Sequence, residues 1–238
     1  IGFLSYRLYV KDVQYKYKAE KMTHLEHDYA NKIQGLESAV DSLNKTAYTH
    51  TVTKIGNIDY FINRCTSLFE RFPDSVFTMI GFSISNLGKI NQFFGPSEGD
   101  KVMVYTAEML KYSVTGNATY AHVNSNLFGI LLRDTTEEEI MEIIGAITAK
   151  LKDYSPTFAV TAIFGIYYID CSRTGDSMMD IMNYTLLAQK AVTDPKTVNY
   201  AYFTEALIRS YNENKKMSVE MEEALDNHKF IVYLQPMI

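Results

Sequence analysis

Apolar side chains recur every three or four residues near the start of the chain, where residues 11–47 contain no proline and a single glycine. The recurring positions are Met22, Leu25, Tyr29, Ile33, Leu36, Val40, Leu43 and Ala47. This spacing predicts one long helix with a single apolar stripe. Met22, Tyr29, Leu36 and Leu43 keep a strict seven-residue spacing, which favours a parallel two-stranded coiled coil and therefore a homodimer. A helix that folds back on its own domain is the alternative.

From residue 51 onward, short apolar runs alternate with helical patterns. The periodicity predicts helices at residues 59–72, 98–112, 135–151 and 177–192, and strands at 76–85, 120–123, 127–132, 158–169 and 198–203. The polar stretch Asn124-Ser125-Asn126 between two strands is typical of a hairpin turn. Helices that alternate with strands and include one hairpin predict an α+β fold, in which helices flank a central, mostly antiparallel sheet.

Composition narrows the function classes. The chain has 47% hydrophobic and 21% charged residues, as expected for a soluble globular protein. Its formal net charge of -5 argues against nucleic acid as a partner. Cys65 and Cys171 form neither a disulfide framework nor a zinc pattern, which favours a reducing cytoplasm. His24 and His27 have no further ligand nearby in the pattern, so we expect no metal there.

The first ten residues, IGFLSYRLYV, are apolar and aromatic, and the chain does not begin with methionine. Between Arg7 and Lys21, five basic residues stand against two acidic ones. Basic residues collect where a membrane helix leaves the bilayer on the cytoplasmic side. A membrane segment ahead of this sequence is therefore one expectation, and an ordinary helix start is the other.

Four stretches in the rest of the chain carry the spacing of a known motif set. Residues 50–57 (HTVTKIGN) align with D-x-L-T-x-L-x-N. Residues 83–100 align with D-x-D-x-F-K-x-I-N-D-x-x-G-H-x-x-G-D and keep its Ile-Asn and Gly-Asp pairs. Residues 122–128 (HVNSNLF) stand against R-x-G-G-D-E-F, and residues 183–190 (NYTLLAQK) against D-x-A-L-Y-x-A-K. In this order the stretches resemble the GGDEF domain of bacterial cyclic-di-GMP signalling proteins, which has a nucleotide-cyclase, ferredoxin-like palm fold. His50 and His122 replace an acid and an arginine of these motifs.

The resemblance implies a degenerate diguanylate cyclase. Working members join two GTP molecules on divalent ions held by acidic side chains, and the aligned metal-ligand positions here are Ser83 and Asn126. Neutral side chains offset the dehydration of Mg²⁺ poorly. The signature positions are Asn124, Ser125, Asn126, Leu127 and Phe128, of which only Phe128 is retained. We therefore expect no catalytic residue, no metal and no cofactor.

Part of the nucleotide pocket is retained in the sequence. In the family, the positions of Asn91 and Asp100 contact the guanine edge and that of Lys190 approaches the phosphates. Asn offers a donor and an acceptor, and Asp accepts from the guanine N1 and N2 groups, so GTP is a candidate effector. The alternative is that Asn91 closes a turn and Asp100 starts a helix. The feedback motif R-x-x-D falls on residues 115–118 (TGNA), which lack both charges.

The last residues, 221–236, resemble the first helix and strand of an EAL phosphodiesterase domain, A-L-x-x-x-x-F-x-x-x-x-Q-P. We therefore expect three parts: a signalling helix at 1–48, a degenerate GGDEF domain at 49–210, and at 211–238 a linker with the start of a truncated EAL domain. The resemblance implies a cytoplasmic domain of an inner-membrane-anchored bacterial protein.

These observations favour a regulatory and dimerisation module that relays a signal to a downstream EAL domain. A GTP sensor that controls the EAL domain is the alternative. An enzyme with altered chemistry is disfavoured by the missing acids.

Overall fold

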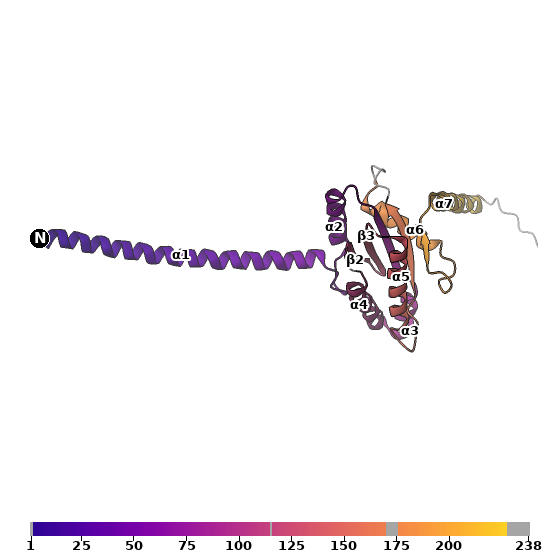
Figure 1. The fold of residues 1–238 in the computed structure, drawn as a ribbon, viewed down its shortest axis with the longest axis horizontal. Coiled ribbons are helices and arrows are strands. Elements are labelled where there is room, and N and C mark those ends of the chain that lie inside the picture. Colours follow the sequence, from indigo (N-terminus) through magenta and orange to yellow (C-terminus); the bar gives the residue numbers. More distant parts are fainter. Residues whose placement is uncertain (1, 115, 170–175, 228–238) are drawn as a thin grey trace, which may run out of the picture. The chain divides into compact units, whose positions relative to one another are not determined.

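The computed structural model describes residues 2–114, 116–169 and 176–227. The chain divides after Tyr48 into two units. The first is a single helix, α1 (Gly2–Tyr48) (Figure 1). The positions of the predicted stripe all lie on this helix. From Met22 to Leu43 the large apolar side chains of the stripe are 42% to 69% exposed. Among the described residues, no helix has the length and apolar character needed to cross a membrane.

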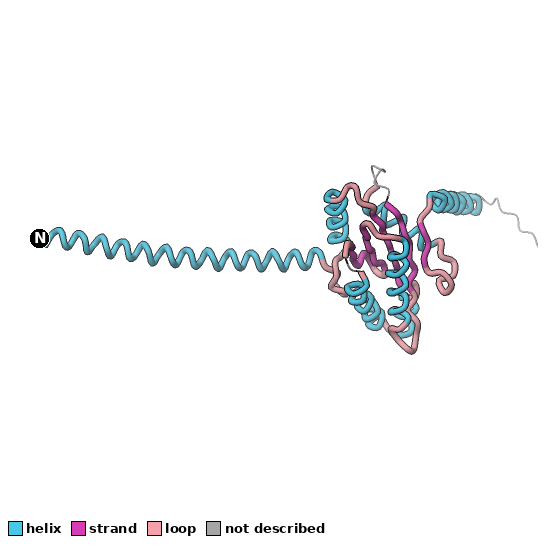
Figure 2. Tube along the Cα trace, in the orientation of Figure 1, coloured by secondary structure: helices cyan, strands magenta, loops and turns pink. Residues whose placement is uncertain are grey.

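The second unit is a five-stranded sheet with helices around it (Figure 2). Its strands are β1 (Phe77–Ile84), β2 (Ala118–Asn124), β3 (Leu127–Arg133), β4 (Ala162–Ile169) and β5 (Tyr200–Tyr202). Its helices are α2 (Ile58–Arg71), α3 (Leu87–Phe94), α4 (Pro96–Ser113), α5 (Glu137–Lys152), α6 (Met178–Lys190) and α7 (Glu205–Asp226). The strand order is β2-β3-β1-β4-β5, and only the β4–β5 pair is parallel. The predicted α+β fold with a mostly antiparallel sheet is confirmed.

Helix α3, strand β4 and helix α7 differ from the sequence prediction, and Asn86 is involved in the first two. Residues 87–94 form the additional helix α3, and β4 begins at Ala162 rather than at residue 158. Because β1 ends at Ile84, the residues before Ala162 have no strand beside them. The side chain of Asn86 takes that place: its Nδ2 donates to the carbonyl of Ala159 at 2.7 Å, and its Oδ1 accepts from the N–H of Thr161 at 3.0 Å.

Each face of the sheet has its own core. Helices α3, α4 and α5 cover one face, where Ile90, Val102 and Ile140 pack around stacked Phe82, Phe128 and Phe164. Helices α2 and α6 cover the other face, with Phe61, Cys65, Met79 and Ile181 among the buried residues. Cys65 is buried and free, whereas Cys171 lies outside the described residues.

A row of small residues crosses all five strands at one level. The register aligns them in the order Ala121, Gly129, Gly81, Gly165 and Ala201. A Cβ at Gly165 would overlap the backbone carbonyl of Thr185, and a Cβ at Gly129 would lie 2.8 Å from the ring of Phe61. Helix α6 therefore packs with its own backbone against the sheet, which brings its last turn close to the end of β1.

Candidate functional site

The two predicted metal-ligand positions lie next to each other where β1 and β3 end. Ser83 of β1 is opposite Leu127 in the antiparallel register. One residue further, the N–H of Ile84 donates to the carbonyl of Asn126 at 3.2 Å, and Asn126 Nδ2 donates back to the carbonyl of Ile84 at 3.2 Å. The fold thus brings Ser83 and Asn126 together, and the amide of Asn126 is engaged by backbone.

The Ser83 hydroxyl is engaged as well. Its Oγ donates to Oε1 of Gln189, in the last turn of α6, at 2.8 Å. Gln189 is only 8% exposed, and within the described part of the chain its Nε2 has no hydrogen-bond partner. Sequence analysis missed Gln189, although the motif D-x-A-L-Y-x-A-K has alanine there and a long polar side chain at that position was a visible departure.

These residues do not fit a divalent ion. Mg²⁺ prefers carboxylate oxygens in near-octahedral geometry, and this location offers a hydroxyl and two carboxamides that already bond to protein groups. The described residues contain no cluster of three or more His, Cys, Asp and Glu side chains that could hold a metal.

The other signature residues serve the core and the turn. Leu127 is buried with the α2 and α6 cluster, and Phe128 is buried on the opposite face. Ser125 adopts a left-handed conformation with φ of 31° at the tip of the hairpin, a region that glycine occupies more readily. The predicted hairpin between residues 123 and 127 is therefore present, with Ser125 and Asn126 as its turn residues.

The predicted guanine-edge pair comes from two consecutive helices. Asn91 lies in the last turn of α3 and Asp100 in the first turns of α4. A Cβ at Gly99 would overlap Oδ1 of Asn91, so the Asn91 carboxamide rests directly on the backbone beside Asp100. This Oδ1 is buried without a hydrogen-bond partner among the described residues, whereas Asp100 is exposed.

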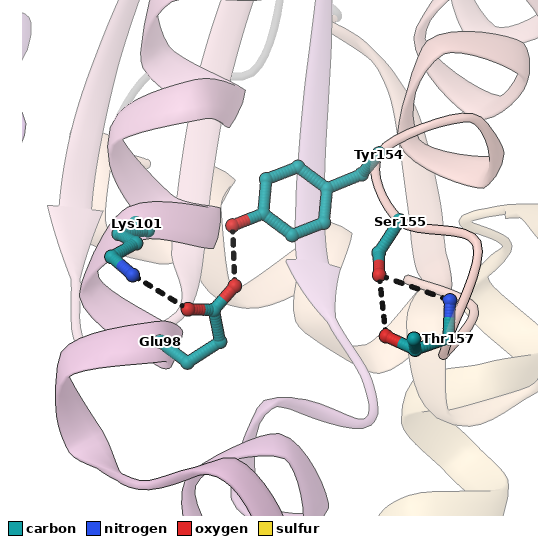
Figure 3. Close-up of polar contacts among 5 residues, drawn as sticks. All are labelled: Glu98, Lys101, Tyr154, Ser155 and Thr157. Carbon is teal, nitrogen blue, oxygen red and sulfur yellow. Dashed lines mark hydrogen bonds and ion pairs between the residues drawn. The ribbon is translucent and has the colours of Figure 1, made fainter.

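A polar contact fixes the start of α4 (Figure 3). Glu98 accepts from Lys101 Nζ at 2.9 Å and from the Tyr154 hydroxyl at 3.0 Å. These two bonds lower the pKa of Glu98, while burial and the bond to Glu98 raise the pKa of Tyr154 to about 12. Because Glu98 precedes Gly99 and Asp100 directly, the contact ties the predicted base-recognition segment to the end of α5.

Lys190, the third predicted nucleotide contact, ends α6. Its Nζ lies 4.9 Å from the centroid of the Tyr211 ring of α7. A cation over an aromatic face is attracted by the ring quadrupole. Lys190 therefore follows Gln189, which contacts the Ser83 position, and itself contacts the helix that leads to the end of the chain.

Two histidines that replace charged motif residues lie against each other. The rings of His50 and His122 stack with centroids 3.7 Å apart, and His122 also stacks on Phe128 at 4.6 Å. Burial and the neighbouring His50 lower the pKa of His122 to about 4. Burial and the charge of Lys54 lower the pKa of His50. Both replacements are visible in the sequence, but nothing in the sequence indicates that the two histidines contact each other.

Some predicted features lie outside the described residues. They are residue 115 of the feedback stretch and residues 228–236 of the EAL-like stretch. Residues 221–226 of the same stretch belong to α7.

The comparisons with known proteins agree on one family. The model of the family described as "Diguanylate cyclase, GGDEF domain" matches residues 47–193. No curated protein sequence matches the chain significantly.

Several solved structures are similar to this chain. The coiled coil and GGDEF domain of DgcB from Caulobacter crescentus, in complex with cyclic-di-GMP, has 15% identity and a TM-score of 0.61 over 74% of this chain and 95% of that one. The S helix-GGDEF-EAL part of LapD from Vibrio cholerae, bound to cyclic-di-GMP, has 18% identity and a TM-score of 0.62 over 82% of this chain and 46% of that one. Diguanylate cyclase SiaD from Pseudomonas aeruginosa, in complex with its activator SiaC, has 18% identity and a TM-score of 0.57 over 84% and 74%. At these identities the likeness shows a shared fold.

Proposed function

Because the chain belongs to the GGDEF domain family, we propose that it is a catalytically inactive regulatory and dimerisation module of cyclic-di-GMP signalling that relays a signal to a downstream EAL phosphodiesterase domain. The observation that carries the proposal is the bonding of the two metal-ligand positions. Ser83 donates to Gln189, and Asn126 donates to the backbone of Ile84. Both side chains are neutral.

The missing negative charge at positions 83 and 126 weakens the binding of divalent ions. Two unit charges 4 Å apart attract by about 4 kcal/mol at the effective dielectric constant of a protein surface. Replacing the acids at positions 83 and 126 by neutral groups removes that attraction for each ion. Leu127, in the place of the second acid of the signature, is buried in the core and offers no oxygen. The degenerate signature at residues 124–128 thus lacks the groups that family chemistry requires.

The relay is supported by α1. Its apolar stripe stays exposed along the helix, and such a stripe is stable in water when a second helix covers it. A homodimer through residues 1–48 supplies that helix. We extend the proposal to the three parts 1–48, 49–210 and 211–238, in a cytoplasmic domain of a membrane-anchored bacterial protein. The support for an EAL domain is the resemblance of residues 221–236, and the similar LapD structure combines GGDEF and EAL parts.

The second candidate is a guanine-nucleotide sensor that controls the EAL domain. The observation that favours it is the Asn91 carboxamide, which rests on Gly99 beside the exposed Asp100 and has a buried oxygen without a partner. In the family pattern, the position of Lys190 is the basic one that approaches the phosphates. In this candidate GTP is an effector and no bond is made or broken.

Two measurements test the proposal. The purified chain, incubated with GTP and Mg²⁺, should form no cyclic-di-GMP by chromatography and mass spectrometry, while an active GGDEF protein assayed in parallel does. Product that disappears in an Asp100→Ala variant would overturn the inactive assignment. Calorimetric titration with GTP then separates the two candidates: heat of binding supports the sensor, and no heat at millimolar GTP leaves the relay alone.

A further inference from the structure

His50 and His122 connect two segments that lie far apart in the sequence. His50 follows the end of α1 by two residues, and its N–H donates to the carbonyl of Ile55 at 2.8 Å across a tight turn. His122 lies in β2, and its N–H donates to the carbonyl of Gly56 in the same turn at 2.9 Å. The stacked rings therefore clamp the turn of residues 50–56 onto the strand that leads into the signature hairpin.

The hydrogen bonds of this clamp require an unprotonated nitrogen on His50. Its Nδ1 accepts from the N–H groups of Val52 at 3.3 Å and Thr53 at 3.4 Å. A backbone N–H only donates, so a proton on this Nδ1 breaks both bonds. The ring in the observed geometry is therefore neutral.

The same reasoning assigns the ring of His122. Its Nε2 lies 3.2 Å from the carbonyl oxygen of Ser125, which only accepts, so Nε2 carries the hydrogen. Its Nδ1 lies 3.2 Å from the hydroxyl of Thr53, which donates to it when the ring is neutral. His122 is 1% exposed, so a charge on this ring would be removed from water.

The charged and titratable groups that act on the pair are few. The turn contributes Lys54, whose charge opposes a proton on His50, and His50 in turn opposes a proton on His122. Within the described part of the chain, the other groups in contact with the pair are neutral: the ring of Phe128 from β3, the hydroxyl of Thr53, and the backbone of the hairpin at Asn124 and Ser125. Two protonated rings stacked at 3.7 Å would repel each other.

We propose that the neutral His50–His122 stack is a proton-operated joint between the turn that follows α1 and the signature hairpin, and that uptake of a proton opens it. The family motifs have an acid and an arginine at these two positions, so the same contact there would join opposite charges that stay ionised between pH 5 and 8. In this chain the two positions hold side chains whose charge changes with pH, in place of two side chains of fixed charge. The joint does not depend on the proposed relay, but where the relay operates it adds acid as an input at the end of the signalling helix.

The pKa values determine in which direction the stability of the joint changes with pH. Both histidines have a pKa in the fold below the ordinary value of about 6.5. The folded joint is therefore fully stable above about pH 6.5 and loses stability as the pH falls from there toward about 4, because the open form binds more protons. For one ring with these two values, the open form gains about 30-fold in population at pH 5.

Hydrogen exchange of the full chain tests the joint. Protection factors, corrected for the intrinsic pH dependence of exchange, should fall at least about 10-fold between pH 7.5 and pH 5 for amides of residues 50–56 and 122–126. Amides in the centre of β1 and β4 should change much less. A double variant, His50→Asp with His122→Arg, restores opposite charges and should lose this difference. The matched control, His24→Gln with His27→Gln on exposed positions of α1, should respond as the unmodified chain does.

An equal fall in the unmodified chain and in the double variant overturns the proposal. Where the double variant does not fold, nuclear magnetic resonance titration of the two ring Cε1–H signals in the unmodified chain decides. Midpoints below the ordinary value for both rings support the joint, and an ordinary midpoint for either ring overturns it. Neither readout uses nucleotide or an EAL domain, so failure of the joint and failure of the proposed function are distinguishable.

Discussion

The hydroxyl of Ser83 and the side-chain carbonyl of Gln189 lie 2.8 Å apart, and their hydrogen bond joins the end of β1 to the last turn of α6. The family motifs have an acid at position 83 and a small alanine at position 189. The two departures complement each other, because a longer side chain from α6 satisfies the hydroxyl that replaced the carboxylate. The space near a former ligand position has become part of the packing of the domain.

A double-mutant cycle should measure this bond. Ser83→Ala leaves a buried carbonyl of Gln189 unpaired, so it should lower the free energy of unfolding by about 1–3 kcal/mol. Combined with Gln189→Leu, the coupling energy should be about 0.5–1.5 kcal/mol by urea denaturation. In a control cycle of Ser83→Ala with Gln92→Leu, on the exposed side of α3, the effects should add. Additivity in the first cycle as well would mean that the bond contributes nothing.

The glycine row provides a second test with a matched control. Gly165→Ala drives a methyl group into the carbonyl of Thr185, and since backbone yields little, it should destabilise the fold by about 1–3 kcal/mol. Gly145→Ala, in α5, meets nothing within 4 Å and should stabilise by about 0.5–1 kcal/mol through helix propensity. Chemical denaturation of both variants checks the pair. Equal effects of the same sign would contradict the close approach of α6.

The periodic parts of the fold were predictable from the sequence because local spacing specifies them. The stripe of α1, the strand β1 and the helix α5 were predicted from the spacing of apolar positions that lie two to four residues apart. Helix α3 was missed because its eight residues form barely two turns, and it follows Asn86, whose side chain bonds to Ala159 and Thr161, 73 and 75 positions away. Such tertiary bonds leave no local trace.

The candidate site was predictable only in part. Motif spacing identified Ser83, Asn126, Asn91 and Asp100, and the fold brings the first two together. Motif spacing identified no partner for any of them. The Ser83–Gln189 and His50–His122 contacts bridge segments far apart in the chain, and the contact of Asn91 with Gly99 depends on how α3 and α4 pack. Spacing within a motif says which side chains are present, while three-dimensional packing decides what they bond to.

The exposed stripe of α1 predicts the oligomeric state. Leu36→Asp introduces a charge at a seam position and should shift a dimer toward monomer, because each buried leucine contributes roughly 2 kcal/mol and a symmetric dimer loses two. Ser38→Asp, two residues along the same exposed helix and off the stripe, should leave the dimer unchanged. Analytical ultracentrifugation over a range of concentrations measures both. A monomer before any substitution would refute the seam.

The guanine-edge pair predicts base selectivity. If GTP is an effector, GTP and GDP should bind and ATP should not, since adenine presents no N1–H or 2-amino donor to Asp100. Asp100→Ala should weaken GTP binding about 5- to 150-fold, the loss expected for an unpaired polar group. Gly99→Ala should weaken it too, because the added methyl group displaces Asn91. Gln92→Ala is the control, and equal affinity for ATP and GTP in calorimetry would assign Asn91 and Asp100 to the fold alone.

Alkaline pH should destabilise the second unit through its tyrosines. Burial and the bond to Glu98 raise the pKa of Tyr154 to about 12, and burial and the bond to Glu137 raise the pKa of Tyr202. An unfolded tyrosine ionises near about 10. The stabilisation is therefore complete below about pH 10 and lost as the pH rises toward 12. The unfolding temperature of the chain should fall steeply as the pH rises through this window, and it should fall less steeply for Tyr154→Phe. The same dependence on pH in both proteins would contradict the contact.

The row of small residues across the sheet also affects which side chains of such a domain can be replaced during evolution. At Gly165 the row sets the spacing between the sheet and α6 by contact with the backbone of Thr185, and this contact does not involve the side chains at positions 83, 126, 127 and 189. Each of these positions can then be exchanged separately while the domain remains folded. A lineage that no longer needs the chemistry can replace its reactive groups one at a time, with every intermediate still stable enough to be inherited.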